Sequence, residues 1–175
     1  MRWLDWWRRA SIRQVMAVTA AATTLVAGLL YALERWGGMA PCALCWTQRG
    51  MLLGVGLAAL LTLAVNPERR PARLVMASIL ALPLLGGIAV ALRHLYVISR
   101  PEAVDCGFGI EMMVGMFPWQ EVAQALILGQ SGCSEVSPLL GLPVPLWSLA
   151  LFVLLSVALV PLLRPARGLS RKLLN

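Results

Sequence analysis

The amino-acid sequence predicts an all-α membrane protein, a four-transmembrane-helix bundle with a short membrane-surface helix in its second outer loop. Of its 175 residues, 59% are hydrophobic and only 13% are charged, which is too apolar for an ordinary soluble domain. Four apolar windows approach the roughly 20 residues that a helix needs to cross a hydrocarbon core. The basic residues gather beside these windows instead of spreading along the chain. We expect one integral membrane domain over residues 1–175.

The four windows are predicted spans over residues 15–33, 46–65, 74–92 and 146–163. Three of them contain no charged residue, and the second contains one cation, Arg49. Backbone groups inside lipid must bond to one another, so each window is expected to form a helix. We expect the first window to be a retained span, because it is longer than the core of a signal peptide and no small-residue cleavage site follows it.

The basic residues set the expected orientation. Eleven of the fifteen Lys and Arg residues fall on one side of the membrane if the spans alternate. The positive-inside rule makes that side cytoplasmic, with both termini there and with outer loops at about 34–45 and 93–145. These basic residues can contact anionic lipid headgroups, and no nucleic-acid-binding motif is present, so the pI of about 10.3 does not indicate a nucleic-acid partner. The eleven are Arg2, Arg8, Arg9, Arg13, Arg69, Arg70, Arg73, Arg164, Arg167, Arg171 and Lys172.

The same alternation places all four cysteines on the outer side. Cys42 and Cys45 lie between the first and second spans, and Cys106 and Cys133 lie between the third and fourth. In a bacterium the outer compartment is oxidising, and disulfides form and persist there. Disulfides are therefore permitted at all four positions.

Four interpretations of the Cys-x-x-Cys motif compete. A c-type haem site requires His directly after the second cysteine, and Trp46 stands there. A zinc site made of all four thiolates is disfavoured, because the 26 residues between Cys106 and Cys133 offer no metal-binding knuckle, and no metal is expected. A structural Cys106–Cys133 disulfide could stabilise the fold by about 3–4 kcal/mol in the chain-entropy model. The fourth interpretation is a redox-active cysteine pair.

The surroundings of Cys45 favour redox chemistry. A helix is expected to begin at this motif, and a helix N-terminus together with a nearby cation favours the reactive thiolate. Arg49 follows Cys45 by four residues and shares its helix face. An arginine at membrane depth indicates a functional site, although a guanidinium that merely extends to the interface is the alternative. A quinone fits such a site, because Arg49 can hydrogen-bond its carbonyl and stabilise developing negative charge.

The second outer loop contains the predicted surface helix. Apolar residues recur at helical spacing from Trp119 to Ile127, with Pro118 before them and Gly129 after them. This helix either lies on the membrane surface and positions Cys133 near Cys42, or packs against the end of the bundle.

Together these residues resemble the DsbB family of quinone-dependent, disulfide-generating membrane proteins. The likeness rests on Pro-Cys-Ala-Leu-Cys-Trp-Thr-Gln-Arg at the start of the second span, four spans, and a long outer loop with a second cysteine pair. The resemblance implies a bacterial inner-membrane oxidoreductase with its active site facing the periplasm. It implies a DsbA-like, thioredoxin-fold periplasmic partner and ubiquinone or menaquinone as the electron acceptor.

The resemblance also implies an electron path. The partner's thiolate would attack Cys106 of a Cys106–Cys133 disulfide and release Cys133. Cys133 would attack Cys42, which frees Cys45 beside Arg49, and the Cys42–Cys45 disulfide would re-form as the quinone is reduced. Direction depends on relative potentials, about 30 mV per 1.4 kcal/mol.

Two further residues are candidates for the quinone pocket. His94 is the only histidine, and family members often carry a histidine near this place, associated with the quinone. A capping or interfacial histidine is the alternative. Gln48, beside Arg49, is the second candidate.

Other functions remain open. A vitamin-K-epoxide-reductase-like protein performs related chemistry on four helices, but its Cys-x-x-Cys follows the loop cysteines, the reverse of the order here. A paralogue dedicated to one substrate is possible. So is a structural membrane protein braced by two disulfides, which Cys45→Ser would distinguish.

Overall fold

The computed structural model describes residues 10–37, 41–65, 67–100, 110–129, 133, 138–139 and 141–163. It confirms the predicted fold class, a bundle of four long apolar helices, each long and apolar enough to cross a membrane. Three of these are continuous, and the fourth is α7 with two short continuations. Their bounds are α2 Ile12–Gly37, α3 Ala43–Val65, α4 Arg70–Ser99, α7 Val144–Ser156, η3 Val157–Leu159 and α8 Val160–Leu163.

The helices extend past the apolar windows at one or both ends. The α4 helix has 30 residues, about 45 Å at 1.5 Å per residue, whereas a hydrocarbon core is about 30 Å thick. Apolar composition marks the part of a helix that meets lipid, while backbone hydrogen bonding continues beyond it. His94, which the hydropathy pattern places just past the third window, therefore lies on α4 itself.

The fourth membrane-crossing helix changes geometry before its end. Pro161 has no backbone N–H to donate to the carbonyl of Val157, four residues earlier, and its ring crowds that carbonyl. The Val160 N–H bonds to the Val157 carbonyl instead, in the tighter 3₁₀ pattern. The short η3 turn is the result, and α8 continues the span to Leu163.

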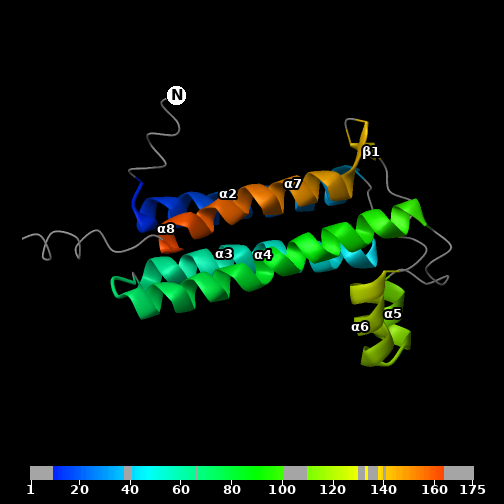
Figure 1. The fold of residues 1–175 in the computed structure, drawn as a ribbon. Helices are drawn as coiled ribbons and strands as arrows, with labels where there is room; N and C mark the ends of the chain where they lie inside the picture. The colour runs from blue at the N-terminus through cyan, green and yellow to red at the C-terminus, as the bar shows by residue number, and fades with distance from the viewer. Residues whose placement is uncertain are drawn as a thin grey trace, which may run out of the picture.

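Helices that follow one another in the chain pack side by side. Contacts join α2 to α3, α3 to α4 and α4 to α7, and η3 and α8 also contact α2 (Figure 1). Apolar side chains fill the interior, among them the fully buried Val55, Leu80 and Leu84, with Phe152 from α7. Gly87 permits the close approach of α4 and α7, because an added Cβ would lie 2.3 Å from the Phe152 ring.

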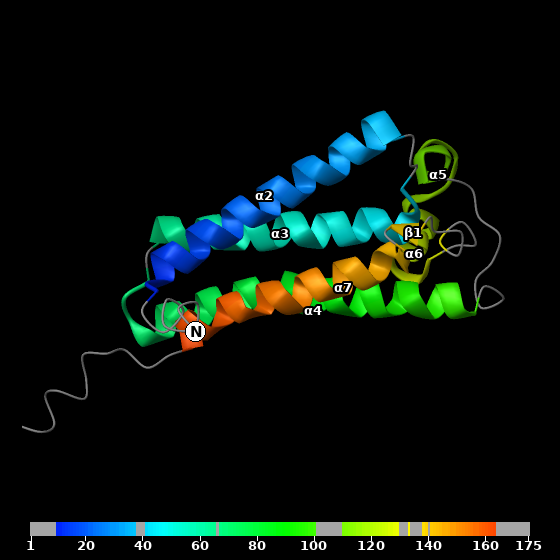
Figure 2. The same ribbon diagram turned by 90° about the horizontal axis from the view of Figure 1, so that it is seen from above.

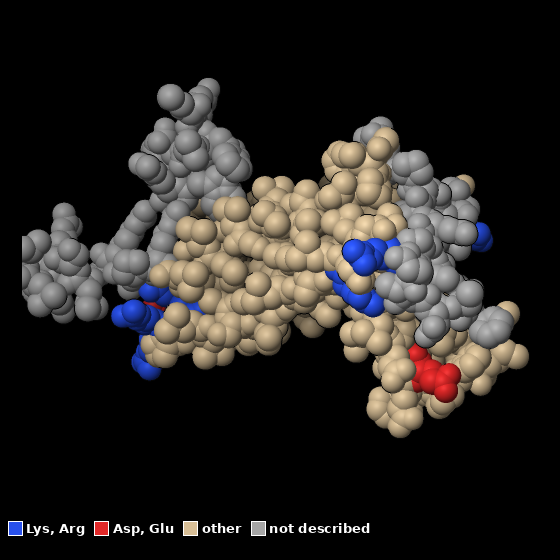
Figure 3. All heavy atoms as spheres, turned by 45° about the vertical axis from the view of Figure 1, so that its right-hand side comes forward, with Lys and Arg blue, Asp and Glu red and all other residues tan. Residues whose placement is uncertain are grey.

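The outer faces of the helices suit lipid. Leu25, Leu82 and Leu85 are all more than 60% exposed, at 74%, 73% and 64%. On the face shown in Figure 3, the blue and red charged side chains lie toward the two ends of the molecule, and the described surface between them is uncharged. We call the end that carries Cys42 the thiol end, and the end at which α4 begins the opposite end.

A helical hairpin projects from the thiol end. It consists of α5 Ile110–Met116 and α6 Trp119–Leu128, and Figures 1 and 2 show it beside the ends of α3 and α4. The predicted helix from Trp119 is present and packs against α3, with Ala125 buried in the contact. Trp119 and Ile127, on the predicted apolar face of this helix, are 75% and 63% exposed, so its contact with a membrane surface stays a prediction.

A two-residue hairpin precedes the fourth membrane-crossing helix. Strand β1 Pro138–Leu139 pairs antiparallel with β2 Leu142–Pro143, in the register Leu139 to Leu142. Gly141 supplies the turn with φ +81°. Leu142 and Pro143 both pair with β1 and directly precede α7, so the hairpin leads straight into that helix.

Candidate thiol redox site

Cys42 caps the N-terminus of α3. It is the residue directly before the helix, and its carbonyl accepts the first helical hydrogen bond from the Trp46 N–H at 3.1 Å. Its sulfur accepts the backbone N–H of Cys45 at 3.3 Å. A sulfur thus stands where Ser or Asp usually bonds the free N–H groups of a helix start. The Cys-x-x-Cys motif therefore lies at a helix N-terminus, as the sequence predicted.

The two sulfurs of the motif face each other. The Cys42 thiol donates to the sulfur of Cys45, and the two Sγ atoms are 2.9 Å apart. Both side chains are partly buried. Ala43 and Leu44 between them are buried in an apolar cluster at the thiol end that also contains Val97, Met113, Ala125 and Cys133. The helical turn brings the two thiols together and leaves them reachable from outside the bundle.

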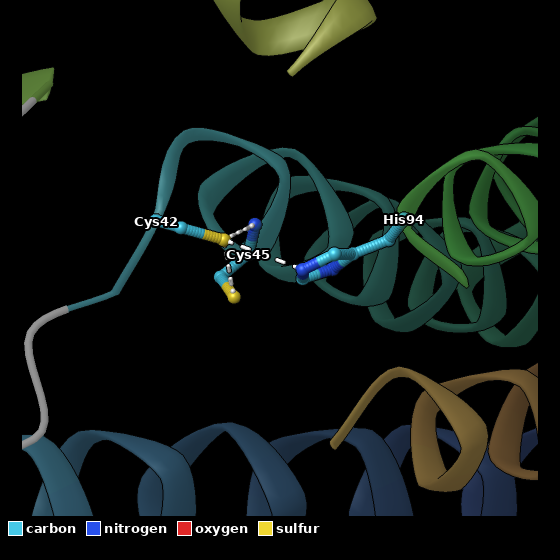
Figure 4. A group of neighbouring side chains, drawn as sticks. All are labelled: Cys42, Cys45 and His94. Carbon is cyan, nitrogen blue, oxygen red and sulfur yellow. Dashed lines mark hydrogen bonds between the residues drawn. The ribbon is translucent and has the colours of Figure 1, made fainter. Parts of the chain in front are cut away.

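His94 joins the site from α4. It is fully buried, and its Nε2 lies 3.7 Å from the Cys42 sulfur (Figure 4). The same nitrogen lies 3.1 Å from the carbonyl oxygen of Cys133. A carbonyl can only accept, so Nε2 carries a proton and donates it. Nδ1 lies 3.3 Å from Nε2 of the Gln48 amide, which donates to it. These two bonds select the neutral Nε2–H tautomer and hold the ring beside Cys42.

The Cys133 side chain also lies beside Cys42. It is buried in the cluster with Ala43, Leu44 and Val97, and its side chain hydrogen-bonds that of Cys42. This bond, then the bond to Cys45 and then burial raise the pKa of Cys42 well above the ordinary value of a thiol. Three cysteine side chains therefore meet at the start of α3, with Cys42 between the other two.

The C-terminal end of α6 is held by side-chain hydrogen bonds to two of its backbone carbonyls. Thr47 Oγ1 donates to the Leu126 carbonyl at 2.7 Å, and Arg93 Nε donates to the Leu128 carbonyl at 3.0 Å. These bonds satisfy two of the last carbonyls of α6, which have no partner inside the helix. Gly129 then turns the chain with φ +85° against Leu44. Side chains of α3 and α4 thus fix the end of α6, which lies five residues before Cys133 in the chain.

Arg49 lies one turn after Cys45 and points to a partner on α2. Its Nη1 donates to the Glu34 carboxylate, and its guanidinium lies 5.8 Å from the centre of the Trp46 ring. The Arg49 and Glu34 side chains are 22% and 25% exposed. Figure 2 shows α2 diverging from α3 toward the thiol end, and this ion pair joins the two helices there.

A family model described as "Disulfide bond formation protein DsbB" matches residues 12–162, nearly the whole of the described chain. The chain belongs to the DsbB family. It is accordingly a multi-pass membrane protein and a disulfide-forming oxidoreductase. The resemblance found in the sequence is confirmed.

Curated DsbB proteins cover most of the chain. "Disulfide bond formation protein B" of Alkalilimnicola ehrlichii is 38% identical over 145 residues, which is 83% of this chain and 87% of that protein. The protein of the same name from Stutzerimonas stutzeri is 34% identical, covering 83% and 91%. That of Acinetobacter baylyi is 32% identical, covering 77% and 82%. No solved structure matches the chain.

Within this DsbB-family site, the structure brings together most of the residues selected from the sequence. Cys42, Cys45, Cys133, His94 and Gln48 form one connected cluster. Arg49 lies one turn away on α3, paired with Glu34. Cys106 lies outside the described residues, so its pairing stays a prediction.

The cluster also has the composition of a metal site. Ligand atoms of Cys42, Cys45 and His94 lie within 4.8 Å of one another. Two thiolates and an imidazole suit a soft ion such as zinc. A Cys42–Cys45 disulfide would remove both thiolates. Metal binding and disulfide formation by these two sulfurs are therefore mutually exclusive.

Three contributors were missed by sequence reasoning. Glu34 is an acid near the outer end of the first span, and span alternation puts it on the side of Arg49, so pairing charges by side could have found it. Thr47 and Arg93 carry no such signal, because their partners are backbone carbonyls of a helix far along the chain.

Proposed function

We propose that this DsbB-family protein re-oxidises a periplasmic DsbA-like dithiol and passes the electrons to a membrane quinone. The observation that carries the proposal is the position of Cys42, whose side chain hydrogen-bonds both Cys133 and Cys45. Thiol–disulfide exchange needs an attacking sulfur beside one sulfur of a disulfide whose other sulfur can leave. Cys133, Cys42 and Cys45 are arranged in that order.

Each exchange step conserves electrons. The partner's thiolate attacks Cys106 of the Cys106–Cys133 disulfide, forms a mixed disulfide with it, and releases Cys133 as a thiolate. Cys133 then attacks Cys42 of the Cys42–Cys45 disulfide, forms a Cys133–Cys42 disulfide, and releases Cys45 as a thiolate. The partner's second thiol attacks the mixed disulfide, which oxidises the partner and leaves Cys106 reduced. Cys106 then attacks Cys133, which restores Cys106–Cys133 and leaves Cys42 and Cys45 as a dithiol.

The hydrogen bonds give the two thiols of the motif different protonation states. The raised pKa of Cys42 keeps it protonated in the reduced site, and its S–H points at Cys45. A hydrogen bond donated to a thiolate stabilises the negative charge. Cys45, beside the guanidinium on the next turn, therefore carries the charge that reacts.

The residues around Arg49 fit a quinone headgroup. Arg49 has further N–H donors besides the one bonded to Glu34, and the 43%-exposed Trp46 and 60%-exposed Leu53 supply an apolar surround. Arg49 would hydrogen-bond a quinone carbonyl, and Glu34 would keep its guanidinium in place. A bound quinone, ubiquinone or menaquinone, supplies the oxidant that accepts the two electrons and two protons released as Cys42 and Cys45 form a disulfide.

The proposal includes the cellular setting. We place the protein in the bacterial inner membrane with both termini cytoplasmic and the thiol end facing the periplasm. This orientation rests on the positive-inside rule. It puts the cysteines in the compartment in which a DsbA-like partner works.

Anaerobic mixing tests the function. The purified protein is combined with a reduced DsbA-like protein and a quinone, and quinol and partner disulfide are measured together. We expect one quinol per partner disulfide formed. Quinol that does not accumulate in this proportion would sink the proposal.

Two variants separate the function from a structural role of the disulfides. Cys45→Ser should abolish turnover, because no thiolate remains to pass electrons on, whereas a braced scaffold would lose only some stability. Ser156→Ala, far from the thiols along α7, serves as the control and should keep full turnover.

A further inference from the structure

Arg73, the fourth residue of α4, lies at the opposite end and has a buried side chain that makes no ion pair among the described residues. Its side chain is 7% exposed, and its Nε is buried with no hydrogen-bond acceptor. Glu68, the nearest acid along the chain, forms no ion pair with it among the described residues. Burying a charge and leaving it unpaired is costly in a low-dielectric setting, so a charge of this kind normally has an anion beside it.

The helix that carries Arg73 also begins without a cap. Its N-cap residue is Arg69, whose side chain makes no capping hydrogen bond, and its first turn contains no acidic residue. The first N–H groups of a helix and its dipole favour an anion. At the start of α4, Arg69 and Arg70 add two exposed cations to that positive end.

The same turn meets the lipid. Leu74 and Val75, directly after Arg73, are 47% and 54% exposed on the membrane-crossing part of α4. An acyl chain lying on them would bring its headgroup to the level of Arg73 and the helix N-terminus. Basic residues at the ends of membrane helices bind anionic headgroups in this way.

We propose that Arg73 and the N-terminus of α4 bind the phosphate of an anionic phospholipid. Arg73 supplies a fixed guanidinium that bonds the phosphate oxygens. The N–H groups of Arg70 and Ala72 complete the site, because Pro71 between them has none. The exposed Leu74 and Val75 hold the acyl chain. The site is far from the thiols and does not depend on the redox function.

Native mass spectrometry of the full-length protein in mild detergent tests the site. The probes are phosphatidylglycerol, phosphatidylcholine of the same acyl chains, and inorganic phosphate. We expect one phosphatidylglycerol to stay bound to the wild type at concentrations at which phosphatidylcholine does not. Arg73→Gln should weaken this binding by about tenfold, the size of one lost charge-assisted interaction.

Matched variants make the result specific. Arg70→Gln removes an exposed cation from the same end and should keep most of the binding. Arg73→Lys keeps the charge without the planar fork and should bind at an intermediate level, which also covers the case that Arg73→Gln does not fold.

Three outcomes would overturn the proposal. These are equal phosphatidylglycerol binding by the wild type and Arg73→Gln, equal losses in Arg73→Gln and Arg70→Gln, and equal binding of the two lipids by the wild type. Displacement of the lipid by millimolar inorganic phosphate would assign the site to free phosphate and overturn the lipid occupant.

Discussion

At the scale of single residues, hydrogen bonds and an ion pair fix the orientations of His94 and Arg49. Gln48 and the Cys133 carbonyl select one tautomer of His94, and Glu34 fixes Arg49 beside Trp46. His94 is therefore more than an interfacial histidine, since a fully buried ring bridges the helix of the motif and the segment of Cys133. Its link to a quinone stays a prediction.

Replacing the partner of Arg49 should affect quinone use alone. Glu34→Gln keeps the shape but removes the charge that orients the guanidinium, so we expect quinol formation to fall by about tenfold, or about 1.4 kcal/mol. Exchange between the partner and the cysteines should change little. Stopped-flow measurement of both steps checks this.

A matched acid provides the control. Glu121→Gln, on the exposed surface of α6, should leave both steps unchanged. Equal losses of quinol formation and thiol exchange in Glu34→Gln would show that the Glu34–Arg49 pair only supports the fold.

The reactivity of Cys42 should depend on pH through its hydrogen bonds. The pKa of Cys42 is raised in the folded, reduced protein. Its thiol therefore stays protonated at and above about pH 8.5, the ordinary pKa of a cysteine thiol. The bonds that raise it stabilise the fold below that pH, and this contribution is lost as pH rises toward the folded pKa. We expect alkylation of Cys42 at pH 8.5 to be slower than in the unfolded chain and to rise with pH without a plateau.

Mass spectrometry of the alkylated peptide measures that rate. Cys133→Ala removes the first cause of the shift and should speed alkylation of Cys42 at pH 8.5. An unchanged rate in Cys133→Ala would contradict the assigned hydrogen bond.

At the scale of elements, α6 acts as a support for Cys133. Thr47 and Arg93 bind its last carbonyls, and Gly129 adopts φ +85° and ψ 172°, a conformation that is essentially restricted to glycine. The helix predicted for this loop exists because its apolar and polar residues alternate at helical spacing. It packs on α3 through Ala125, and Trp119 and Ile127 face outward, where a membrane surface could receive them.

Adding one methyl group at the end of α6 should disturb the approach of Cys133. Gly129→Ala would be strained by its backbone conformation, at a cost of about 1–3 kcal/mol, and its Cβ would lie 2.8 Å from Leu44. We expect slower transfer from Cys133 to Cys42, measured by rapid acid quench and thiol trapping, with the membrane helices intact by circular dichroism.

The control is Gly115→Ala on α5, where nothing lies within 4 Å of the added Cβ. It should transfer at the wild-type rate. If Gly129→Ala also transfers at that rate, the turn does not position Cys133.

At the scale of the whole molecule, the bundle joins two chemically different ends through an uncharged middle. The thiol end carries Cys42, Cys45 and Cys133 with His94 and the Arg49–Glu34 pair, and the opposite end carries the buried Arg73. Close contacts between helices at glycines, such as Gly87 against Phe152, hold these ends in register.

Filling the contact at Gly87 should destabilise the bundle. Gly87→Ala places a Cβ 2.3 Å from the Phe152 ring, and such overpacking costs about 1–3 kcal/mol. We expect a lower thermal midpoint by circular dichroism in detergent. Gly28→Ala, with nothing within 4 Å on α2, should not lower it, and equal midpoints of the two variants would refute the contact.

The sequence by itself determined the four membrane-crossing helices, the orientation hypothesis and the chemistry of the Cys-x-x-Cys motif. Hydropathy, charge placement and the spacing of Cys45 and Arg49 are local properties of the chain, so a linear pattern contains them. Only the tertiary structure brought His94 and Cys133 to Cys42 and gave Arg49 its partner Glu34. It also left the Nε of Arg73 without a hydrogen-bond partner within the part of the chain that the structure describes. Those contacts join residues on different helices, and which helix faces meet depends on packing at positions such as Gly87 and Gly129, which no linear pattern specifies.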